Sequence, residues 1–454
     1  MRNSLIKQAI LFLSMVGGLA YGQMVNPVVS TAPTNGNADD PAIWIHPTDL
    51  TRSVIIGTDK DAGIYVWNMD GEELQHLEQG TTCNNVDVRY RIQLDGQLTD
   101  IVATNLRDAG KLAVFKVNPN STNGEVLTQI AGESSENNDI QGNSYGFALY
   151  RRPADGTLYV FEYPETGGAV RQYRIQDDGT GNGIALNAVR DLNYDGGQAE
   201  GFVADDELGF IYVTEEAGGI HKFYADPEAS VDRISLFATG DGTADDREGV
   251  AIYACGNGTG YLVLSSQGNS TIKIYERQGN NRFIKTIVAT NEDGNEGLGS
   301  DGLDVTSAAA ANFPQGFVVV HDQDGSKFHL YNWLDFAQSD MTICVNGAPN
   351  TAVADDGFGV LPGQFELAQN YPNPFNPSTT IFFELPKASE VTLSIYTIQG
   401  QLVRTLISGK VAAGRHQASW DGTNYKNVRV ASGLYVYRLE TPGFVASKEL
   451  VLTR

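Results

Sequence analysis

The sequence predicts an all-β protein, in which a six-bladed β-propeller is followed by a small immunoglobulin-like β-sandwich. Three observations lead to this fold class. Glycine contributes 50 of the 454 residues, well above its usual share of about 7%, which indicates many tight turns. A strand pair recurs along the middle of the chain, and the sequence changes in character after a Gly- and Pro-containing stretch near its end.

The recurring unit is a short apolar strand, a polar break and an alternating strand rich in aromatic residues. Its six copies start at residues 53, 100, 156, 209, 260 and 316, so the steps lie between 47 and 56 residues. Several strands per unit at this period are typical of a β-propeller, whose radial closure protects the sheet edges. We expect residues 23–345 to form six blades, with Met24–Thr31 supplying an outer strand that closes the ring.

The first 22 residues have the pattern of an export signal. Arg2 and Lys7 precede a short apolar run, and small residues stand at positions suited to cleavage before Gln23. No later segment approaches the roughly 20 unbroken apolar residues of a membrane span. We therefore expect the mature chain to lack a transmembrane segment. It should be exported through the periplasm and then be either secreted or held at the outer cell surface.

Charge and cysteine content exclude several classes of protein. The formal net charge of −24 argues against a nucleic-acid binder that works through a basic surface. The three cysteines, Cys83, Cys255 and Cys344, are far apart and include no CxxC pair, which excludes a zinc ribbon and a disulfide scaffold. We expect buried, unpaired thiols in preference to one disulfide plus one free thiol.

The C-terminal part is predicted to be a separate domain. Residues 346–364 are small, polar and Gly/Pro-containing, as in a linker, and residues 365–454 alternate as a β-sandwich does. The motif NYPNPFNP from Asn370, the Gly400 turn, the strand ASGLYVY from Ala431 and the basic end at Arg454 resemble the sorting domain of the type IX secretion system. That resemblance implies the secretion machinery as a partner; the alternative is an accessory sandwich that binds a protein or carbohydrate.

The polar break falls at the same point of every repeat, and equivalent points of successive blades lie on one face around the central channel. We therefore expect acidic, amide and basic groups to converge there, unless they are ordinary polar hairpin turns. The residues at these points are Asp59, Lys60, Arg107, Glu165, Glu215, Glu216, Gln267 and Asp322.

Oxygen-donor residues cluster in the segments 37–44 and 83–90, and such hard donors suit Ca²⁺. The six histidines are scattered, which disfavours zinc and iron. An acidic channel would repel an anionic substrate unless metal ions reverse the local field. Lys60 and Arg107 add fixed positive charge at equivalent blade positions, so the sequence predicts a site that grips phosphate.

The propeller region resembles the calcium-dependent β-propeller phytases. The motifs that carry this resemblance, in order along the chain, are DDPAIW from Asp39, NNVDVRY from Asn84, YGFALY from Tyr145, AEG from Ala199, Glu248-Gly, SSQGNS from Ser265, IYERQG from Ile274 and SDGLDV from Ser300. The resemblance implies hydrolysis of phosphate monoesters of inositol hexakisphosphate, bound as a calcium complex, by calcium-activated water and without a covalent phosphoenzyme. We expect the enzyme to be a monomer.

The resemblance also implies roles for individual residues. Calcium ligands are expected at Asp39, Asp40, Glu200, Glu216, Asp246, Glu248, Gln267 and Asp301. A further, fold-stabilising calcium site is expected at Asn84, Asn85 and Asp87. Phosphate contacts are expected at Lys60, Arg107 and Tyr145, which with Glu200 form the predicted catalytic set. Glu165 stands where the family can offer a lysine, so one phosphate contact is absent or replaced.

Rival chemistries lack their signatures. The sequence contains no RHGxRxP or HCxxGxxR loop, no GxSxG nucleophile elbow and no P-loop, so covalent catalysis loses its usual candidates. One remaining alternative is a noncatalytic calcium-binding propeller that binds a surface glycan or protein. Another is a propeller lactonase or a related calcium-dependent hydrolase, whose site would be less cationic than one with Lys60 and Arg107.

Overall fold

The computed structural model describes residues 22–94, 96–180, 183–256, 258–344, 365–367, 370, 373–375, 379–386, 389–411, 414–426 and 428–453. The predicted export signal, residues 1–22, lies outside the described residues except for Gly22, and the predicted linker, 346–364, lies outside them entirely. Among the described residues, no helix is both long enough and apolar enough to cross a membrane.

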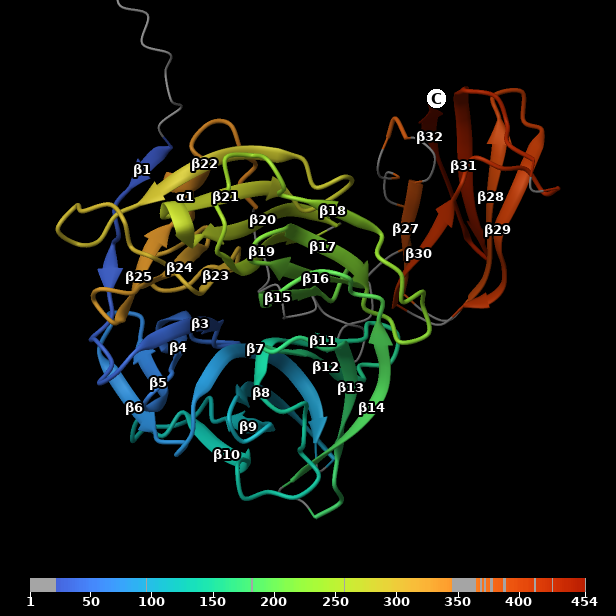
Figure 1. Ribbon diagram of the computed structural model, residues 1–454. Coiled ribbons are helices and arrows are strands. Elements are labelled where there is room, and N and C mark those ends of the chain that lie inside the picture. Colours follow the sequence, from blue (N-terminus) through green and yellow to red (C-terminus); the bar gives the residue numbers. More distant parts are fainter. Residues whose placement is uncertain are drawn as a thin grey trace, which may run out of the picture.

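The first three blades of the ring in Figure 1 use strands β3 to β14, each blade running from its innermost to its outermost strand. Blade 1 consists of β3 (Ala38–Trp44), β4 (Val54–Asp59), β5 (Gly63–Asn68) and β6 (Glu73–Leu77). Blade 2 consists of β7 (Cys83–Leu94), β8 (Gln97–Leu106), β9 (Lys111–Val117) and β10 (Leu127–Ala131). Blade 3 consists of β11 (Ser144–Arg151), β12 (Leu158–Pro164), β13 (Val170–Asp177) and β14 (Ile184–Leu192).

The other three blades complete the ring and confirm the predicted six-bladed propeller. Blade 4 consists of β15 (Ala199–Asp205), β16 (Phe210–Glu215), β17 (Gly219–Tyr224) and β18 (Ser235–Phe237). Blade 5 consists of β19 (Arg247–Gly256), β20 (Thr259–Ser266), β21 (Thr271–Glu276) and β22 (Phe283–Ala289). Blade 6 contains β23 (Leu303–Thr306), β24 (Phe317–Asp322) and β25 (Lys327–Asn332).

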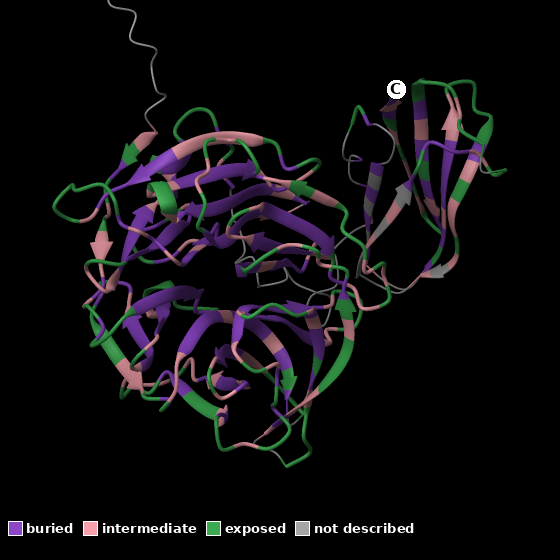
Figure 2. Cartoon of the chain, in the orientation of Figure 1, coloured by how far each residue is buried: buried purple, intermediate pink, exposed green. Residues whose placement is uncertain are grey.

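The recurring sequence unit corresponds to the second and third strands of each blade. These strands read as nearly continuous apolar runs because both of their faces are covered by neighbouring blades; β4, for example, is buried at every position. The outermost strands are more exposed, as Figure 2 shows, and β6 has no buried residue. The innermost strand precedes each repeat and carries the acidic motifs.

The N-terminal segment closes the ring, as predicted. Strand β2 (Val29–Ser30) pairs antiparallel with β25 and becomes the outer strand of blade 6. The structure adds a second contact that the sequence did not predict, because β1 (Gln23–Val25) pairs parallel with β22 of blade 5. The start of the chain therefore ties the last two blades together.

The prediction of three unpaired cysteines is wrong for two of them. Cys255 at the end of β19 and Cys344 form a disulfide, whereas Cys83 is free and buried. The chain returns to blade 5 through the short helix α1 (Trp333–Ala337), where Trp333 stacks on Tyr253 with ring centroids 3.7 Å apart. This return brings together two cysteines that are 89 residues apart in sequence.

The C-terminal domain is a small immunoglobulin-like sandwich, as predicted. One sheet contains β26 (Glu366–Leu367), β27 (Thr379–Leu385) and β30 (Gly414–Trp420). The other contains β28 (Ser389–Thr397), β29 (Leu402–Val411), β31 (Gly433–Thr441) and β32 (Phe444–Leu452). The core between them includes Trp420, Tyr437 and Leu393, all fully buried.

Replacing Cys255 and Cys344 together with Ala should lower the free energy of unfolding by about 3–4 kcal/mol, because the disulfide restricts a long loop of the unfolded chain. Chemical denaturation of the two proteins checks this value. Reductant should destabilise the wild type and leave the double variant unchanged, and an equal response of both proteins would contradict the stabilising role.

Candidate active site

The innermost strands carry β-bulges where the predicted site residues lie. The register shifts between Ala38 and Pro41 in β3, between Cys83 and Val86 in β7, between Ser144 and Gly146 in β11, between Ala199 and Phe202 in β15, and between Arg247 and Val250 in β19. A bulge bends a strand and re-aims its side chains. Consecutive residues, which a regular strand would point to opposite faces, can therefore both face the channel.

Glycine follows site carboxylates where innermost strands of adjacent blades come close. A Cβ atom at Gly201 would lie 2.0 Å from the carbonyl oxygen of Glu248, and one at Gly302 would lie 2.2 Å from Asp40 Oδ1. Any side chain at these two positions would push the blades apart. In the pairs Glu200-Gly201 and Asp301-Gly302, the first residue supplies the carboxylate, and the glycine leaves the space that lets adjacent blades come close.

We call the end of the channel at the hairpin turns between the second and third strands the mouth. Three carboxylates gather there. One oxygen each of Glu200, Glu216 and Glu248 lies within 4.8 Å of the other two. Burial, and next the charge of Glu200, raise the pKa of Glu248 well above its usual value, and burial raises the pKa of Glu216. None of the three forms an ion pair with a described lysine, arginine or histidine, although Asn84 Nδ2 donates to Glu200 Oε1 at 2.7 Å.

Lys60 lies beside this trio and bridges two blades. Its Nζ is 2.7 Å from Asp39 Oδ1 and 3.6 Å from Asp301 Oδ2. Burial opposes the charge of Lys60, but Asp39 and its neighbours outweigh burial and raise the pKa of the ammonium group. Gln267 donates from Nε2 to Asp301 Oδ1, which ties blade 5 to the same group.

Arg107 and Tyr145 form the cationic wall of the mouth. The guanidinium carbon of Arg107 lies 4.9 Å from the ring centroid of Tyr145, a cation–π geometry. Arg107 also pairs with Glu165. Burial and the neighbouring Glu200 raise the pKa of Tyr145, so its phenol stays protonated at neutral pH.

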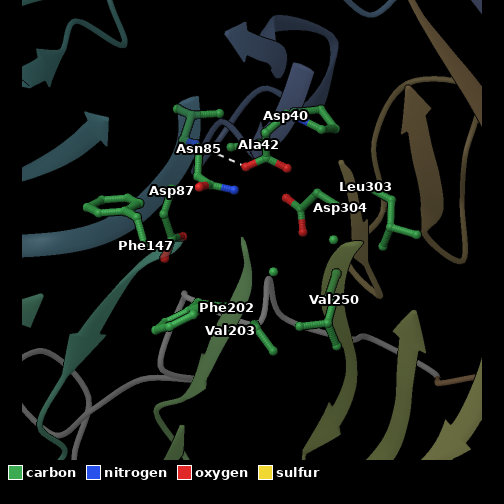
Figure 3. A pocket seen from close by; sticks show the side chains of 15 residues that line it. Asp40, Ala42, Asn85, Asp87, Phe147, Phe202, Val203, Val250, Leu303 and Asp304 are labelled. Atoms are coloured by element: carbon green, nitrogen blue, oxygen red, sulfur yellow. Dashed lines mark hydrogen bonds between the residues drawn. The ribbon is translucent and has the colours of Figure 1, made fainter. Parts of the chain in front are cut away.

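Four polar residues lie further along the innermost strands and line the channel itself. Asp40, Asn85, Asp87 and Asp304 face a small cavity. The opposite wall of this cavity is apolar, as Figure 3 shows. Burial raises the pKa of Asp304 to about 7 and also raises the pKa of Asp40 and Asp87. We call these four residues the channel group.

The structure therefore divides the predicted site residues between two places. Asp39, Asn84, Glu200, Glu216, Glu248, Gln267 and Asp301 meet Lys60, Arg107 and Tyr145 at the mouth, and Asp246 is exposed near Glu216. Asp40 lies in the channel group and not beside Asp39. The side chain of Asn84, which the sequence grouped with Asn85 and Asp87, bonds to Glu200 at the mouth.

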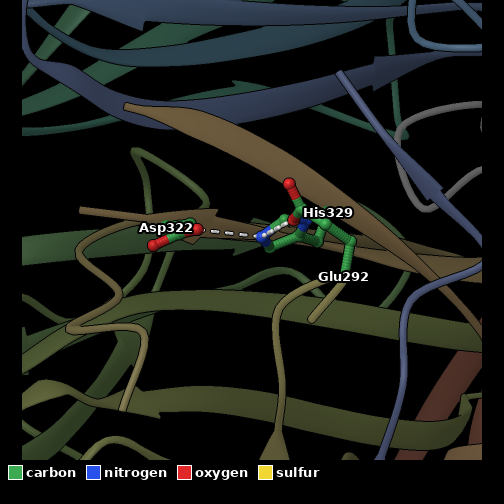
Figure 4. A group of neighbouring side chains, drawn as sticks. All are labelled: Glu292, Asp322 and His329. Atoms are coloured by element: carbon green, nitrogen blue, oxygen red, sulfur yellow. Dashed lines mark hydrogen bonds and ion pairs between the residues drawn. The ribbon is translucent and has the colours of Figure 1, made fainter. Parts of the chain in front are cut away.

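Three of the turn carboxylates do not join the mouth, so the expectation that all polar breaks converge is wrong for them. The buried carboxylate of Asp59 accepts backbone N–H groups of the surrounding loops, and the other two pair with histidines. Asp322 Oδ2 lies 3.0 Å from His329 Nε2 (Figure 4), and Glu215 Oε2 lies 2.8 Å from His221 Nε2. In both blades a buried histidine on the following strand draws the carboxylate toward the blade. Glu292 also approaches His329, which makes this group a second cluster of potential ligands.

Asp304 had no predicted role, yet it belongs to the channel group. Its signal in the sequence is spacing, because Asp304 follows Asp301 by three residues, as Asp87 follows Asn84. In both segments the first residue of the pair lies at the mouth and the second faces the channel. The same spacing could have marked Asp304 as a site residue.

Comparisons with known proteins agree with this geometry. The Phytase family model matches residues 22–330, and the FlgD Ig-like domain model matches residues 375–442. The 3-phytase of Bacillus subtilis (strain 168) is 36% identical over 314 residues, covering 66% of this chain and 80% of the relative.

Solved structures are more distant. PorZ, a surface component of the type IX secretion system of Porphyromonas gingivalis, has a TM-score of 0.37 at 12% identity, covering 91% of this chain and 51% of PorZ. The Cps50 (Swd1) propeller domain of Myceliophteria thermophila has a TM-score of 0.39 at 11% identity, covering 64% of this chain and 82% of that domain. Scores this low carry no argument about function, so the assignment depends on the family match and the relative: the chain belongs to the phytase family of hydrolases.

Proposed function

We propose that this phytase is a calcium-dependent phosphomonoesterase that releases phosphate from inositol hexakisphosphate presented as a calcium complex. The observation that carries the proposal is the arrangement at the mouth, where Glu200, Glu216 and Glu248 lie close together without a cationic partner among the described residues. Lys60 and Arg107 flank the carboxylates. Such a site attracts divalent cations first and a polyanion with them.

The donor set fits calcium. Asn84 Oδ1, Glu216 Oε1 and Glu248 Oε2 are buried, and each lacks a hydrogen-bond partner among the described residues. Buried oxygens without partners are costly, and a hard cation that takes six to eight oxygen ligands removes that cost. The residues that would hold calcium are Asp39, Asn84, Glu200, Glu216, Asp246, Glu248, Gln267 and Asp301 at the mouth, and Asp40, Asn85, Asp87 and Asp304 in the channel.

When bound, calcium supplies positive charge that offsets the carboxylates and activates water for attack on phosphorus. The side chains of the mouth would orient the phosphate. Arg107 offers a planar, bidentate fork that the ring of Tyr145 holds in place. The protonated phenol of Tyr145 and the ammonium group of Lys60 would each donate a hydrogen bond to a phosphate oxygen.

Export and sorting are also part of the proposal. A disulfide such as Cys255–Cys344 forms in oxidising compartments, which supports a location outside the cytoplasm. The immunoglobulin-like domain, with its NYPNPFNP segment and basic end, would act as the address read by the type IX secretion machinery. No catalytic role is assigned to this domain.

The decisive experiment measures phosphate release from calcium phytate by the purified protein, with and without a chelator. We expect hydrolysis that stops when calcium is removed and returns when it is restored, because the mouth carboxylates otherwise repel the substrate. Activity that survives complete removal of calcium would exclude the proposed mechanism.

Arg107→Ala should lower kcat/KM by about 100-fold or more, since a charge-assisted fork that grips the transition state is lost. The melting temperature should change little, because Arg107 is partly exposed at the rim of the mouth. Arg171→Ala is the matched control: it removes an arginine whose partner, Asp191, lies on the neighbouring outer strand of blade 3. Equal losses of activity in the two variants would contradict the role of Arg107.

Glu248→Gln tests the carboxylate trio without substrate. The raised pKa of Glu248 means that the native state holds this proton more tightly than the unfolded chain does. The associated stability is complete below the pKa of an unfolded glutamate, about 4.3, and is lost as the pH rises through the raised native value.

In chelator at pH 8, Glu248→Gln should therefore melt about 2–4 °C higher than the wild type, as expected for about 1 kcal/mol. The two proteins should melt alike at pH 4. Calcium should stabilise the wild type more than the variant, and a variant that is less stable than the wild type in chelator at pH 8 would count against a repulsive trio.

A further inference from the structure

Three successive blades place a charged side chain at the hairpin turn between their second and third strands. Lys60 lies between β4 and β5, Arg107 between β8 and β9, and Glu165 between β12 and β13. The first two are cations, and the third is a carboxylate. The ring therefore changes the sign of its charge at the blade next to Arg107.

Glu165 pairs with the guanidinium group of Arg107, which is the proposed phosphate contact. Its Oε1 pairs with the terminal NH2 nitrogen of Arg107. The backbone holds both residues at the mouth, because Glu165 N donates to Asn143 O and Arg107 N donates to Thr82 O, each at 2.9 Å. The side chains of Arg107 and Glu165 are 18% and 35% exposed, so a dissolved anion can reach the pair.

We propose that Glu165 controls phosphate binding at Arg107: it is a counter-ion that neutralises the guanidinium group in the free enzyme and that an incoming phosphate group must displace. This inference rests on the proposed function, since it assumes that Arg107 binds the phosphate of the substrate. Carboxylate and phosphate compete for the same planar fork, so they cannot both use it fully.

The need to displace Glu165 has different consequences for weakly and tightly bound anions. An anion with a single phosphate group must displace Glu165 with few other contacts to compensate. A polyphosphorylated anion also displaces Glu165 once. Its other phosphate groups would in addition contact Lys60 and the calcium ions held by the mouth carboxylates. Because the displacement costs the same free energy for both anions, it lowers both affinities by the same factor. The polyphosphorylated anion still binds through its further contacts, whereas a simple phosphate is left with weak binding.

The test compares Glu165→Gln and Glu165→Lys with the wild type. Asp191→Asn is the matched control, because it removes one negative charge from an exposed arginine pair on the outer strands of the same blade. The probe is inorganic phosphate, titrated calorimetrically at a calcium concentration below the precipitation limit. Glu165→Gln should bind phosphate about threefold to fivefold more tightly, the worth of a partly exposed ion pair; Glu165→Lys should bind more tightly still, and Asp191→Asn should match the wild type.

A double-mutant cycle shows whether the effect passes through Arg107. In the Arg107→Ala background, Glu165→Gln should no longer change phosphate affinity. A gain that persists there would overturn the proposal, because it would reflect the general field of the mouth. Calcium affinity should be unchanged in Glu165→Gln, and a loss of calcium binding would overturn the proposal by making Glu165 a metal ligand.

Kinetics separate this inference from the proposed function. If the wild type hydrolyses calcium phytate, Glu165→Gln should lower KM for phytate and for a simple phosphate monoester by a similar factor. If hydrolysis occurs and Glu165→Gln matches both the wild type and Asp191→Asn in phosphate affinity, only the role of Glu165 fails. If the wild type shows no hydrolysis, the proposed function fails, and the phosphate titration still decides whether Glu165 competes for Arg107.

Discussion

At three junctions of the innermost ring, a buried carboxylate of one blade accepts a hydrogen bond from a backbone N–H of the adjacent blade. Asp304 accepts from Ile43 N at 2.8 Å, Asp40 accepts from Val86 N at 3.0 Å, and Asp87 accepts from Leu149 N at 2.8 Å. These bonds join blade 6 to blade 1, blade 1 to blade 2 and blade 2 to blade 3. At these junctions side chains join the innermost strands, and they also bring negative charge to the axis.

The same carboxylates create the electrostatic problem that a cation can solve. Burial raises the pKa of each of these three carboxylates, and neighbouring carboxylates raise the pKa of Asp40 and Asp304 further. The mouth trio adds three more carboxylates. Proteins commonly keep such destabilising buried charges at sites whose function is binding. Calcium binding would return that stability, so fold and ligand would be coupled through one set of side chains.

Much of this architecture could be predicted from the sequence, because the period of the middle strands is a local signal. The positions of the site side chains were harder to predict. Asp39 and Asp40 are consecutive, so a regular strand would point their side chains to opposite faces. Because of the bulge in β3, Asp39 reaches Lys60 at the mouth and Asp40 faces the channel. The disulfide depends on a contact across the tertiary structure, between cysteines 89 residues apart, and no local spacing encodes it. The histidine partner of Asp322, in contrast, lies on the next strand of the same hairpin.

The two cations of the mouth show why equivalent turn positions do not imply equivalent roles. Lys60 is held by carboxylates that the proposed metal would also use, whereas Arg107 is held by Glu165, which lies outside that set. Metal binding would therefore release Lys60 by competing for Asp39 and Asp301, but it would leave the Arg107–Glu165 pair intact. Only an anion can open that pair, so the mouth would respond to metal and phosphate through separate ion pairs, with Tyr145 fixing the guanidinium in both states.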